Sequence, residues 1–506
     1  MIQSRLACAA LAAAFIAGLA ACSEKSASTT LVINASIVDG TGSPARPGAV
    51  RINGDRIVEV GDLEPKRGET VVDAKGQVLA PGFIDVHSHH DEGLFEMRGA
   101  EPVVSQGVTT IIVGQDGSMT YPVRDLFERM QKTPVAINVA TFVGHGNLRS
   151  DAMGKDDFRR HATPEEIEKM RQGVADGMKA GALGLATGLE YDPGIYSAPE
   201  EVVELAKVAK QYNGRYISHI RSEDRYFWEA LDEIVNIGRE AKIPVEVTHM
   251  KLAMKDWWGQ SARFLGILDK ARAEGIDVIG DIYPYEAWHS DLTVLFPKRD
   301  FTNRESAQFA LDHVSPPDGI ILSSYSPEPE LVGMTLADIA KKKGMDPAAT
   351  LMDLIARSNV EGAQQSIIGK GMTEEDVAAL IAWPYAAICS DGSLDSLHPR
   401  GRGAFTKVLR VYVREKKVLT LEQAVHKMTG LSAANVGIAD RGVIRPGAFA
   451  DLVLFDPATV ADRSTWQDPK ALSTGISEVW VNGVAVWDGS KASGAFPGRA
   501  VLRPGT

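Results

Sequence analysis

The sequence predicts an α/β protein: a (β/α)8 barrel of the TIM type, with a small β-sandwich domain built from both chain ends and an inserted subdomain. Short apolar strands alternate with amphipathic helices through the middle of the chain, and about eight strands fit, the number of a closed barrel. Strand-like runs without partners lie at both chain ends, and joining them gives both a core. Roughly a hundred residues, Pro-rich in part, separate the last two barrel strands, which predicts the insertion.

Residues 1–21 have the features of a signal peptide rather than of folded structure. Arg5 precedes an apolar, alanine-rich run, 6–20, that is too short to span a membrane as a stable helix. The run ends in Leu-Ala-Ala-Cys, which resembles the bacterial lipobox, whose cysteine (here Cys22) is lipidated and becomes the new N-terminus. The polar residues 22–30 then form a tether. A plain secretory signal with an incidental cysteine is the alternative.

The lipobox resemblance implies an exported, periplasmic protein with a lipid anchor, and Ser23 resembles the outer-membrane sorting pattern. If Cys22 is acylated, Cys389 is the one thiol left and no disulfide can form. The net charge of −12 argues against nucleic acid or an anionic membrane surface as the main partner. We therefore expect membrane contact only through the lipid anchor, and the sequence does not indicate an oligomeric state.

The β-sandwich is expected to comprise residues 31–82 and 436–506. In the first part, short apolar runs are separated by turn residues, and Asn53-Gly54 between two of them is a hairpin signal. In the second part, apolar runs return at 450–455 and 479–486, the latter again with an Asn-Gly pair.

The barrel is expected over residues 83–435, with the insertion at about 288–385. Besides the strand at Ile84, strands are predicted at 108–113, 136–143, 183–186, 216–219, 245–249, 276–281 and 386–390. Thr163, Pro164 and Glu166 give one helix a cap, a first-turn proline and a capping-box glutamate, and Pro199 opens another. A helical run at 335–343 falls in the insertion, which could cover the barrel mouth.

Metal-competent side chains recur where these strands end: His87, His89, Asp116, His219, His249 and Asp391. His87 and His89 point to the same side of an extended strand. Because barrel chemistry is placed at the C-terminal ends of the strands, a shared metal site is favoured over separate hydrogen-bonding histidines. For Asp116 and Asp391, each followed by glycine, a simple turn role is the alternative.

The segment 81–89, Pro-Gly-Phe-Ile-Asp-Val-His-Ser-His, is similar to the first-strand motif of the amidohydrolase superfamily. The chain resembles this superfamily and, within it, the N-acyl-D-amino-acid deacylases (D-aminoacylases), over nearly everything after the tether. The segments similar to motifs of the subfamily are 144–149, 187–194, 218–221, 281–285, 390–392 and 398–400, and 447–453 resembles the superfamily's C-terminal strand motif.

The resemblance implies one or two divalent metal ions, Zn²⁺ above all. His219 and His249 would be ligands of a tightly held zinc, and His87 and His89 would serve an adjacent, weaker position. Asp391 would be the catalytic aspartate, which takes a proton from water and delivers it to the departing amine. The metal would polarise the scissile carbonyl and lower the pKa of the attacking water.

Two departures from the family pattern bear on this expectation. Asp116 stands where many of these deacylases carry a zinc-ligating cysteine. A carboxylate can bridge two metals but is a harder donor than a thiolate, so the number and identity of the metals stay open. Trp288 and His289 replace smaller residues and would narrow or reshape one side of the pocket.

The expected substrate is a small molecule, an N-acyl-D-amino acid, hydrolysed at its amide to a D-amino acid and a carboxylate. By resemblance, Lys251 and Tyr191 match positions that hold the substrate's α-carboxylate, and Arg221 and Tyr283 are helpers. A D-specific dipeptidase is one alternative, and a cyclic-amide hydrolase is another, although no lysine stands at a matching strand end. A non-catalytic substrate-binding envelope lipoprotein is the alternative of another class.

Overall fold

The computed structural model describes residues 29–154, 157–360 and 363–506. The predicted signal peptide, Cys22 and most of the tether lie outside the described residues. Thr29 and Thr30, expected in the tether, already belong to the first strand. Among the described residues, no helix is long and apolar enough to cross a membrane.

Eight parallel strand positions form the barrel, as the sequence predicts. They are β6 (Phe83–Asp85), β7 (Val108–Val113), β8 (Asn138–Thr141) with its continuation β9 (Val143–Gly144), β10 (Gly184–Gly188), β11 (Arg215–His219), β12 (Val245–Val247), β13 (Val278–Ile282) and β17 (Ala386–Ile388). Hydrogen bonds run through β6-β7-β8 and through β9 to β17. The ring closes beyond the ends of β17 and β6, where Asp391 N donates to His87 O and His89 N donates to Gly392 O, both at 2.9 Å.

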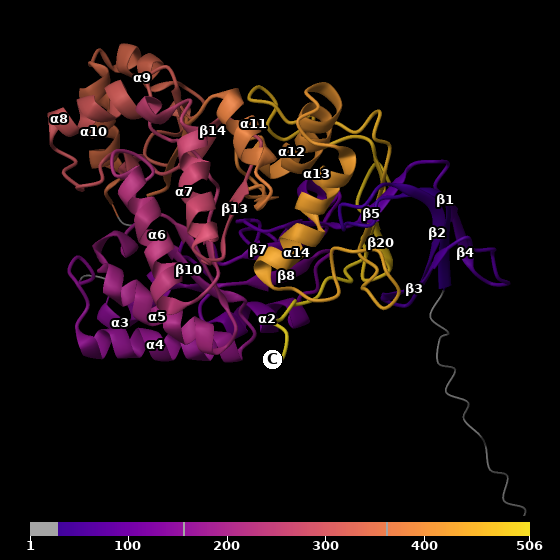
Figure 1. Cartoon of the computed structure of the whole chain (residues 1–506). Coiled ribbons are helices and arrows are strands. Elements are labelled where there is room, and N and C mark those ends of the chain that lie inside the picture. The colour runs from indigo at the N-terminus through magenta and orange to yellow at the C-terminus, as the bar shows by residue number, and fades with distance from the viewer. Residues whose placement is uncertain (1–28, 155–156, 361–362) are drawn as a thin grey trace, which may run out of the picture.

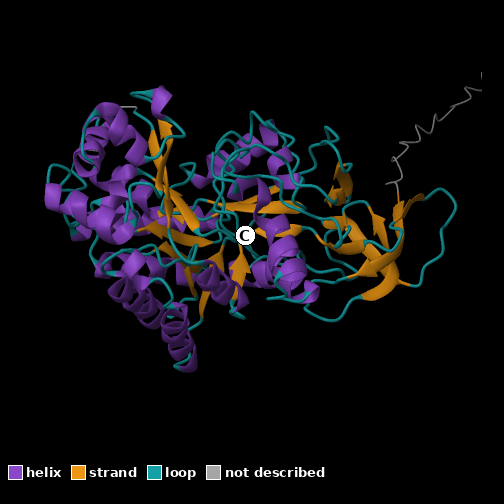
Figure 2. Ribbon diagram, turned by 90° about the horizontal axis from the view of Figure 1, so that it is seen from above, coloured by secondary structure: helices purple, strands orange, loops and turns teal. Residues whose placement is uncertain are grey.

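Helices lie outside the strands (Figures 1 and 2). They are α1 (Glu101–Val104), α2 (Val123–Lys132), α3 (His145–Met153), α4 (Pro164–Lys179), α5 (Pro199–Gln211), α6 (Phe227–Ala241), α7 (Ser261–Ala273), α11 (Glu374–Ala382), α12 (Arg400–Lys407), α13 (Leu421–Met428) and α14 (Gly430–Val436). The capping box predicted for α4 is present, with Thr163 and Glu166 each bonding the other's backbone. The helix buries Met170, Val174 and Met178 in the barrel's apolar core.

The two chain ends join in one sheet, seen where indigo and yellow strands adjoin in Figure 1. Its strands are β1 (Thr29–Ile37), β2 (Arg46–Asn53), β3 (Arg56–Gly61), β4 (Thr70–Asp73), β5 (Val78–Pro81), β18 (Leu452–Phe455), β19 (Ile476–Val481) and β20 (Val484–Trp487). Antiparallel pairing of β18 with β5 makes the connection. Hydrogen bonding is continuous through all eight strands, which enclose a core of their own around Leu79, Leu452 and Trp480.

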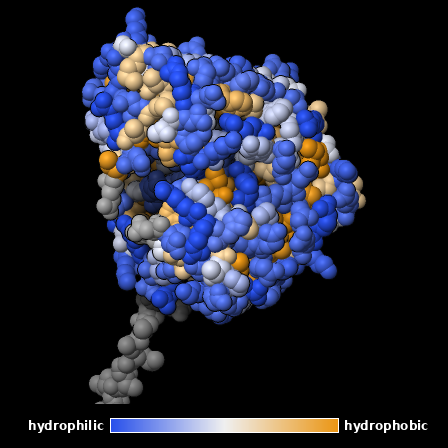
Figure 3. Space-filling view, turned by 90° about the vertical axis from the view of Figure 1, so that its left-hand side faces the viewer, coloured by the Kyte–Doolittle hydropathy of each residue, from blue (hydrophilic) through white to orange (hydrophobic). Residues whose placement is uncertain are grey.

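The insertion is a separate small unit with its own apolar core. It contains the strands β14 (Ala287–Ser290), β15 (Ile320–Tyr325) and β16 (Gln365–Lys370) and the helices α8 (Arg304–Phe309), α9 (Leu336–Lys343) and α10 (Pro347–Ser358). Its expected end at 385 is wrong: β16 ends at Lys370, and α11 packs against α7 and β17 with Leu380 and Ile381 in the barrel core. Figure 3 shows the side of the molecule on which the insertion lies. The surface of that side is mostly hydrophilic and is hollowed near its centre.

The remaining helical segments of the described residues are 3-10 helices or π-helices. They are η1 (Gly194–Tyr196), η2 (Lys255–Trp257), η3 (Leu292–Leu295), η4 (Ala310–Val314), η5 (Pro329–Leu331) and η6 (Val408–Glu415).

Candidate metal centre

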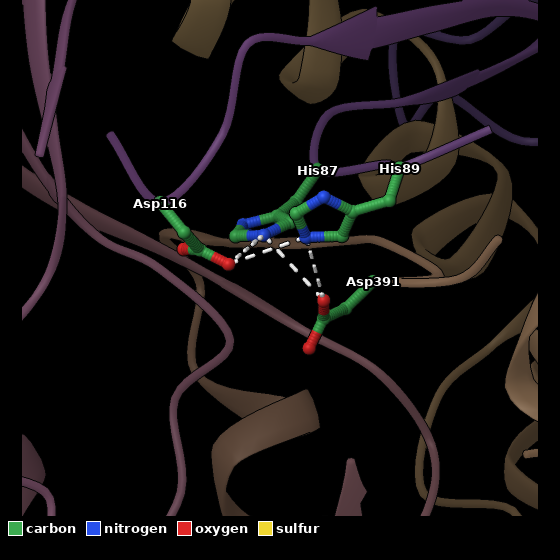
Figure 4. A group of neighbouring side chains, drawn as sticks. All are labelled: His87, His89, Asp116 and Asp391. Atoms are coloured by element: carbon green, nitrogen blue, oxygen red, sulfur yellow. Dashed lines mark hydrogen bonds and ion pairs between the residues drawn. The ribbon is translucent and has the colours of Figure 1, made fainter. Parts of the chain in front are cut away.

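Four of the predicted site residues converge at the mouth of the barrel (Figure 4). His87 and His89 follow β6, Asp116 follows β7 and Asp391 follows β17. His89 Nε2 lies 3.2 Å from Asp116 Oδ2 and 3.4 Å from Asp391 Oδ1. His87 Nε2 lies 3.6 Å from the same two oxygen atoms. Two imidazoles and two carboxylates thus face one point.

A second group adjoins the first through Asp116. Its other oxygen, Oδ1, lies 3.3 Å from His249 Nε2, which lies 3.0 Å from His219 Nδ1. His219 ends β11 and His249 stands two residues after β12. Asp116 therefore presents one oxygen to each group of histidines, which is the arrangement that a bridging carboxylate requires.

The donor sets fit divalent metal ions. The ligand atoms of each group lie within 4.8 Å of one another. Both ring nitrogens of His87 and Oδ1 of Asp116 are buried without a hydrogen-bond partner among the described residues. Buried polar atoms without partners are costly, and a cation would satisfy them. Imidazole nitrogen and carboxylate oxygen are ligands that Zn²⁺ accepts.

Three of these residues have backbone angles that side-chain-bearing residues seldom adopt. Asp116, His249 and Asp391 have φ values of 52°, 35° and 47°. Left-handed conformations at non-glycine residues cost free energy and cluster at functional sites. In each case the residue follows a barrel strand, so the strained turn redirects the side chain toward the shared centre.

The three buried histidines, His87, His219 and His249, each have a carboxylate next to one ring nitrogen. These carboxylates were not predicted from the sequence. His87 Nδ1 lies 3.6 Å from Asp281 Oδ2, and His219 Nε2 lies 3.0 Å from Glu190 Oε2. His249 Nδ1 lies 3.2 Å from Glu223 Oε1. Such outer carboxylates fix the tautomer and orientation of metal-ligating histidines.

The charge balance of the cluster favours a cation. Burial alone would lower the pKa of His89, but Asp116 and Asp391 outweigh it and raise that pKa to about 10. Burial would likewise raise the pKa of Asp391, yet Arg400 and the histidines hold it well below its usual range. The carboxylates are therefore anionic, and positive charge is stabilised between them.

The cluster opens into a cavity of about 750 Å³. Tyr191 lines it, with its ring 4.4 Å from the ring of His219 and its hydroxyl 3.1 Å from Ser290 Oγ. Trp288 and His289 line it from β14 of the insertion, where the sequence places them beside the pocket. Lys251 also lines it, and its Nζ lies 2.7 Å from both Glu223 Oε1 and His249 Nδ1.

The position of Arg221 corrects its expected role in substrate binding. Its guanidinium forms two bonds to Glu233, at 2.7 and 2.8 Å, and it does not line the cavity. The arginine of the cavity is Arg400, whose Nη1 lies 2.6 Å from Asp391 Oδ2. Tyr283 is buried beside it, 4.8 Å from ring centre to guanidinium, with its hydroxyl unbonded among the described residues.

Comparison with known proteins gives a family match. Residues 70–313 and 332–487 match the model of the amidohydrolase family. The N-acyl-D-glutamate deacylase of Alcaligenes xylosoxydans xylosoxydans is 37% identical over 491 residues, which cover 92% of this chain and 95% of that protein.

Two solved structures are similar over 94% of this chain and 99% of theirs. One is a D-aminoacylase, described by the role of its binuclear metal center, with 34% identity and a TM-score of 0.84. The other is the N-acyl-D-glutamate deacylase of Bordetella bronchiseptica, in complex with zinc and a phosphonate that mimics the tetrahedral intermediate, with 35% identity and a TM-score of 0.85.

Proposed function

Because this chain belongs to the amidohydrolase family, we propose that it is a metal-dependent N-acyl-D-amino-acid deacylase. It hydrolyses the linear amide of an N-acyl-D-amino acid to a D-amino acid and a carboxylate, as the names of its relatives suggest. The observation that carries the proposal is the pair of donor groups joined by Asp116, together with the ion pair of Asp391 and Arg400 in the cavity lining.

In this proposal His87, His89, Asp116, His219 and His249 hold one or two divalent ions, with zinc the first candidate. A divalent ion held by these residues would lower the pKa of water and polarise the scissile carbonyl. Asp391 is the general base and acid. Its Oδ1 faces the cluster and its Oδ2 is held by Arg400, so the carboxylate is oriented toward the proposed metal site. It takes a proton from that water and returns it to the departing amine nitrogen.

Lys251, Arg400 and Tyr191 are proposed to hold the substrate's α-carboxylate. All three line the cavity, and both cations lie next to the catalytic cluster. Lys251 and Arg400 now pair with Glu223 and Asp391, so each can share its donors with an incoming carboxylate. Recognition of that group fixes the position of the scissile amide relative to Asp391.

A panel of N-acetyl-D- and N-acetyl-L-amino acids tests the function, on protein whose metal content has been measured. We expect hydrolysis in the D series and at least one divalent ion per chain. Activity confined to the L series would contradict the proposed function. Absence of bound metal together with absence of hydrolysis would favour a binding protein, and opening of dihydropyrimidine or hydantoin rings instead would favour a cyclic-amide hydrolase.

We propose further that the protein is exported and anchored in the periplasm through a lipidated Cys22, at the outer membrane. Support comes from the sequence alone: the apolar leader, the small residues before Cys22 and the polar residues after it. Expression of the full chain and of Cys22→Ser, followed by membrane fractionation and mass analysis of the N-terminus, tests this. A wild-type chain that stays soluble and unacylated would contradict it.

A further inference from the structure

The charges that line the cavity are unbalanced. Nine of the described lining residues carry a carboxylate and two carry a cation, Lys251 and Arg400. Two divalent ions in the metal centre would leave the lining net negative. The carboxylates are Asp91, Glu92, Asp116, Glu190, Asp192, Glu223, Asp224, Asp291 and Asp391.

Both lining cations already form ion pairs with carboxylates close to the proposed reaction centre. Arg400 pairs with Asp391 at 2.6 Å, and Lys251 pairs with Glu223 at 2.7 and 2.8 Å. In the proposed function they hold the one carboxylate that every substrate carries, its α-carboxylate. His289 adds no charge, because burial and the nearby Arg400 lower its pKa to about 3. With His89, His219 and His249 holding metal, as proposed, no other cationic side chain stands among the described lining residues.

Three lining carboxylates, in contrast, form no ion pair among the described residues, and a fourth, Asp224, has only a long one. Asp91, Glu92 and Asp291 form no ion pair with any residue that the structure describes, and Asp291 only accepts bonds from Thr293. Asp224 is 5% exposed, and its Oδ2 has no hydrogen-bond partner among the described residues. The nearest cationic atom to Asp224, Arg225 Nε, is 3.8 Å away. Asp192 differs, since it pairs with Arg299 at 2.9 Å.

A carboxylate at the end of a substrate side chain would therefore enter a cavity of its own sign. Like charges repel, most strongly beside the buried Asp224, and no lining cation is left to compensate. An amide of the same size meets no such repulsion, and it can donate hydrogen bonds to the unpaired carboxylates.

We propose that this enzyme discriminates against a second carboxylate and acts on N-acyl-D-amino acids with uncharged side chains in preference to those of D-glutamate and D-aspartate. The proposal rests on the deacylase function proposed above. It separates this chain from a relative of 37% identity that is named for D-glutamate. The residues that set the preference are Glu92, Asp224 and Asp291, together with the neutral His289.

The test compares N-acetyl-D-glutamine with N-acetyl-D-glutamate, which differ in one charge and hardly in size. We expect kcat/KM to be at least about tenfold higher for the glutamine derivative on the metal-loaded wild-type enzyme. The double variant Glu92→Gln/Asp291→Asn should reduce that ratio severalfold, and Asp224→Asn should reduce it independently. Glu92 and Asp291 are at least partly exposed, so their variants alter charge without disturbing the core.

Glu168→Gln is the matched control. Glu168 is exposed on α4 and outside the cavity, so its variant should leave the ratio unchanged. Equal or faster hydrolysis of the glutamate derivative by the wild type would overturn the proposal. A preference for glutamine that none of the cavity variants reduces would overturn its electrostatic cause. If no N-acyl-D-amino acid is hydrolysed at all, the deacylase function itself has failed.

Discussion

Asp116 is the residue on which the metal count depends. It stands where many related deacylases have a cysteine, and its two oxygens face two different groups of histidines. Asp116→Asn keeps the shape but removes the anionic charge. We expect it to lose at least one bound ion per chain and at least about a hundredfold in kcat, measured by elemental analysis and steady-state kinetics.

Asp116→Cys is the matched variant, because a thiolate is also anionic. It should retain metal and prefer zinc over harder divalent ions more sharply than the wild type does. Competition between Zn²⁺ and Mn²⁺ measures that preference. Unchanged metal content in the Asn variant would show that Asp116 does not bridge the two groups.

Asp391 is expected to carry the proton transfers. Asp391→Asn preserves its size and can still contact Arg400, but it removes the base. We predict a fall in kcat of about 10²–10⁴-fold, with at least one metal ion per chain retained in the group of His219 and His249. Kinetics and elemental analysis on one preparation check both halves of the prediction. A kcat within tenfold of the wild type would place the base elsewhere.

The place of a site residue can be predicted from the sequence when it depends on a single strand. His219 and Asp391 stand at or just beyond the ends of apolar runs, so a shared mouth could be inferred for them. Arg221 also follows a strand, but a helix that packs over it brings Glu233 within 2.7 Å of its guanidinium. The local sequence around a strand end does not predict such a contact with a side chain of another element. Glu223 could have been found only by asking which carboxylates flank His219.

Among the elements, β6 and β17 meet without forming a regular ladder, and Asp85 bridges them. Its carboxylate accepts bonds from Ser390 N at 2.8 Å and Ser390 Oγ at 2.5 Å. Ser390 Oγ in turn accepts a bond from Gly392 N at 3.0 Å. Asp85 therefore holds the turn that carries Asp391.

We predict that Asp85→Asn lowers kcat at least about tenfold and lowers the melting temperature, because a buried bond to the turn is lost. Ser390→Ala, which removes the hydroxyl but keeps the backbone bond, should show a smaller loss of both. The experiment combines calorimetry with kinetics. Full activity in Asp85→Asn would show that the backbone alone positions the turn.

Strand β19 contains a pH-sensitive group far from the chemistry. Burial, with help from Asp488, raises the pKa of Glu478 from 4.5 to about 7. Below pH 4.5 the group is protonated whether folded or unfolded. Between 4.5 and 7 the folded state binds the extra proton, so the free energy of unfolding falls as pH rises, and the full cost is present above pH 7.

Glu478→Gln should therefore be more stable than the wild type by about 1–2 kcal/mol at pH 8, after discounting for partial exposure, and no more stable at pH 4. Denaturant unfolding of the full chain at both pH values measures the difference. Glu168→Gln, on the exposed face of α4, is the control. An equal gain at pH 4 and pH 8 would contradict a titration effect.

Over the whole molecule, the barrel and the union of the two chain ends were predictable, because unpaired strands must find partners and eight strand–helix units close a ring. The end of the insertion was not. The apolar pattern of α11 is the same whether Leu380 and Ile381 pack on the insertion or on the barrel, and the tertiary contact with α7 decides it. Local pattern predicts elements, whereas their partners depend on distant segments.

Finally, the metal centre ties together strands from around the whole barrel. Its proposed ligands lie at the end of β11 or just after the ends of β6, β7 and β12, and Asp391 follows β17. Without a cation, both ring nitrogens of His87 and Oδ1 of Asp116 are buried with no hydrogen-bond partner among the described residues. A ligand that binds only the folded state stabilises it by about 4 kcal/mol at a thousand times its Kd. Chelation should therefore lower the melting temperature of the full chain by several degrees, and added Zn²⁺ should restore it.

Calorimetry on protein stripped of metal, as shown by elemental analysis, measures this shift. His219→Ala, which lacks one proposed ligand, should melt near the temperature of the stripped wild type and respond little to Zn²⁺. His161→Ala, at a histidine outside the cavity, should keep the full response. If stripping leaves the wild-type melting temperature unchanged, the strands are held by their packing alone, and the metal then serves only the reaction.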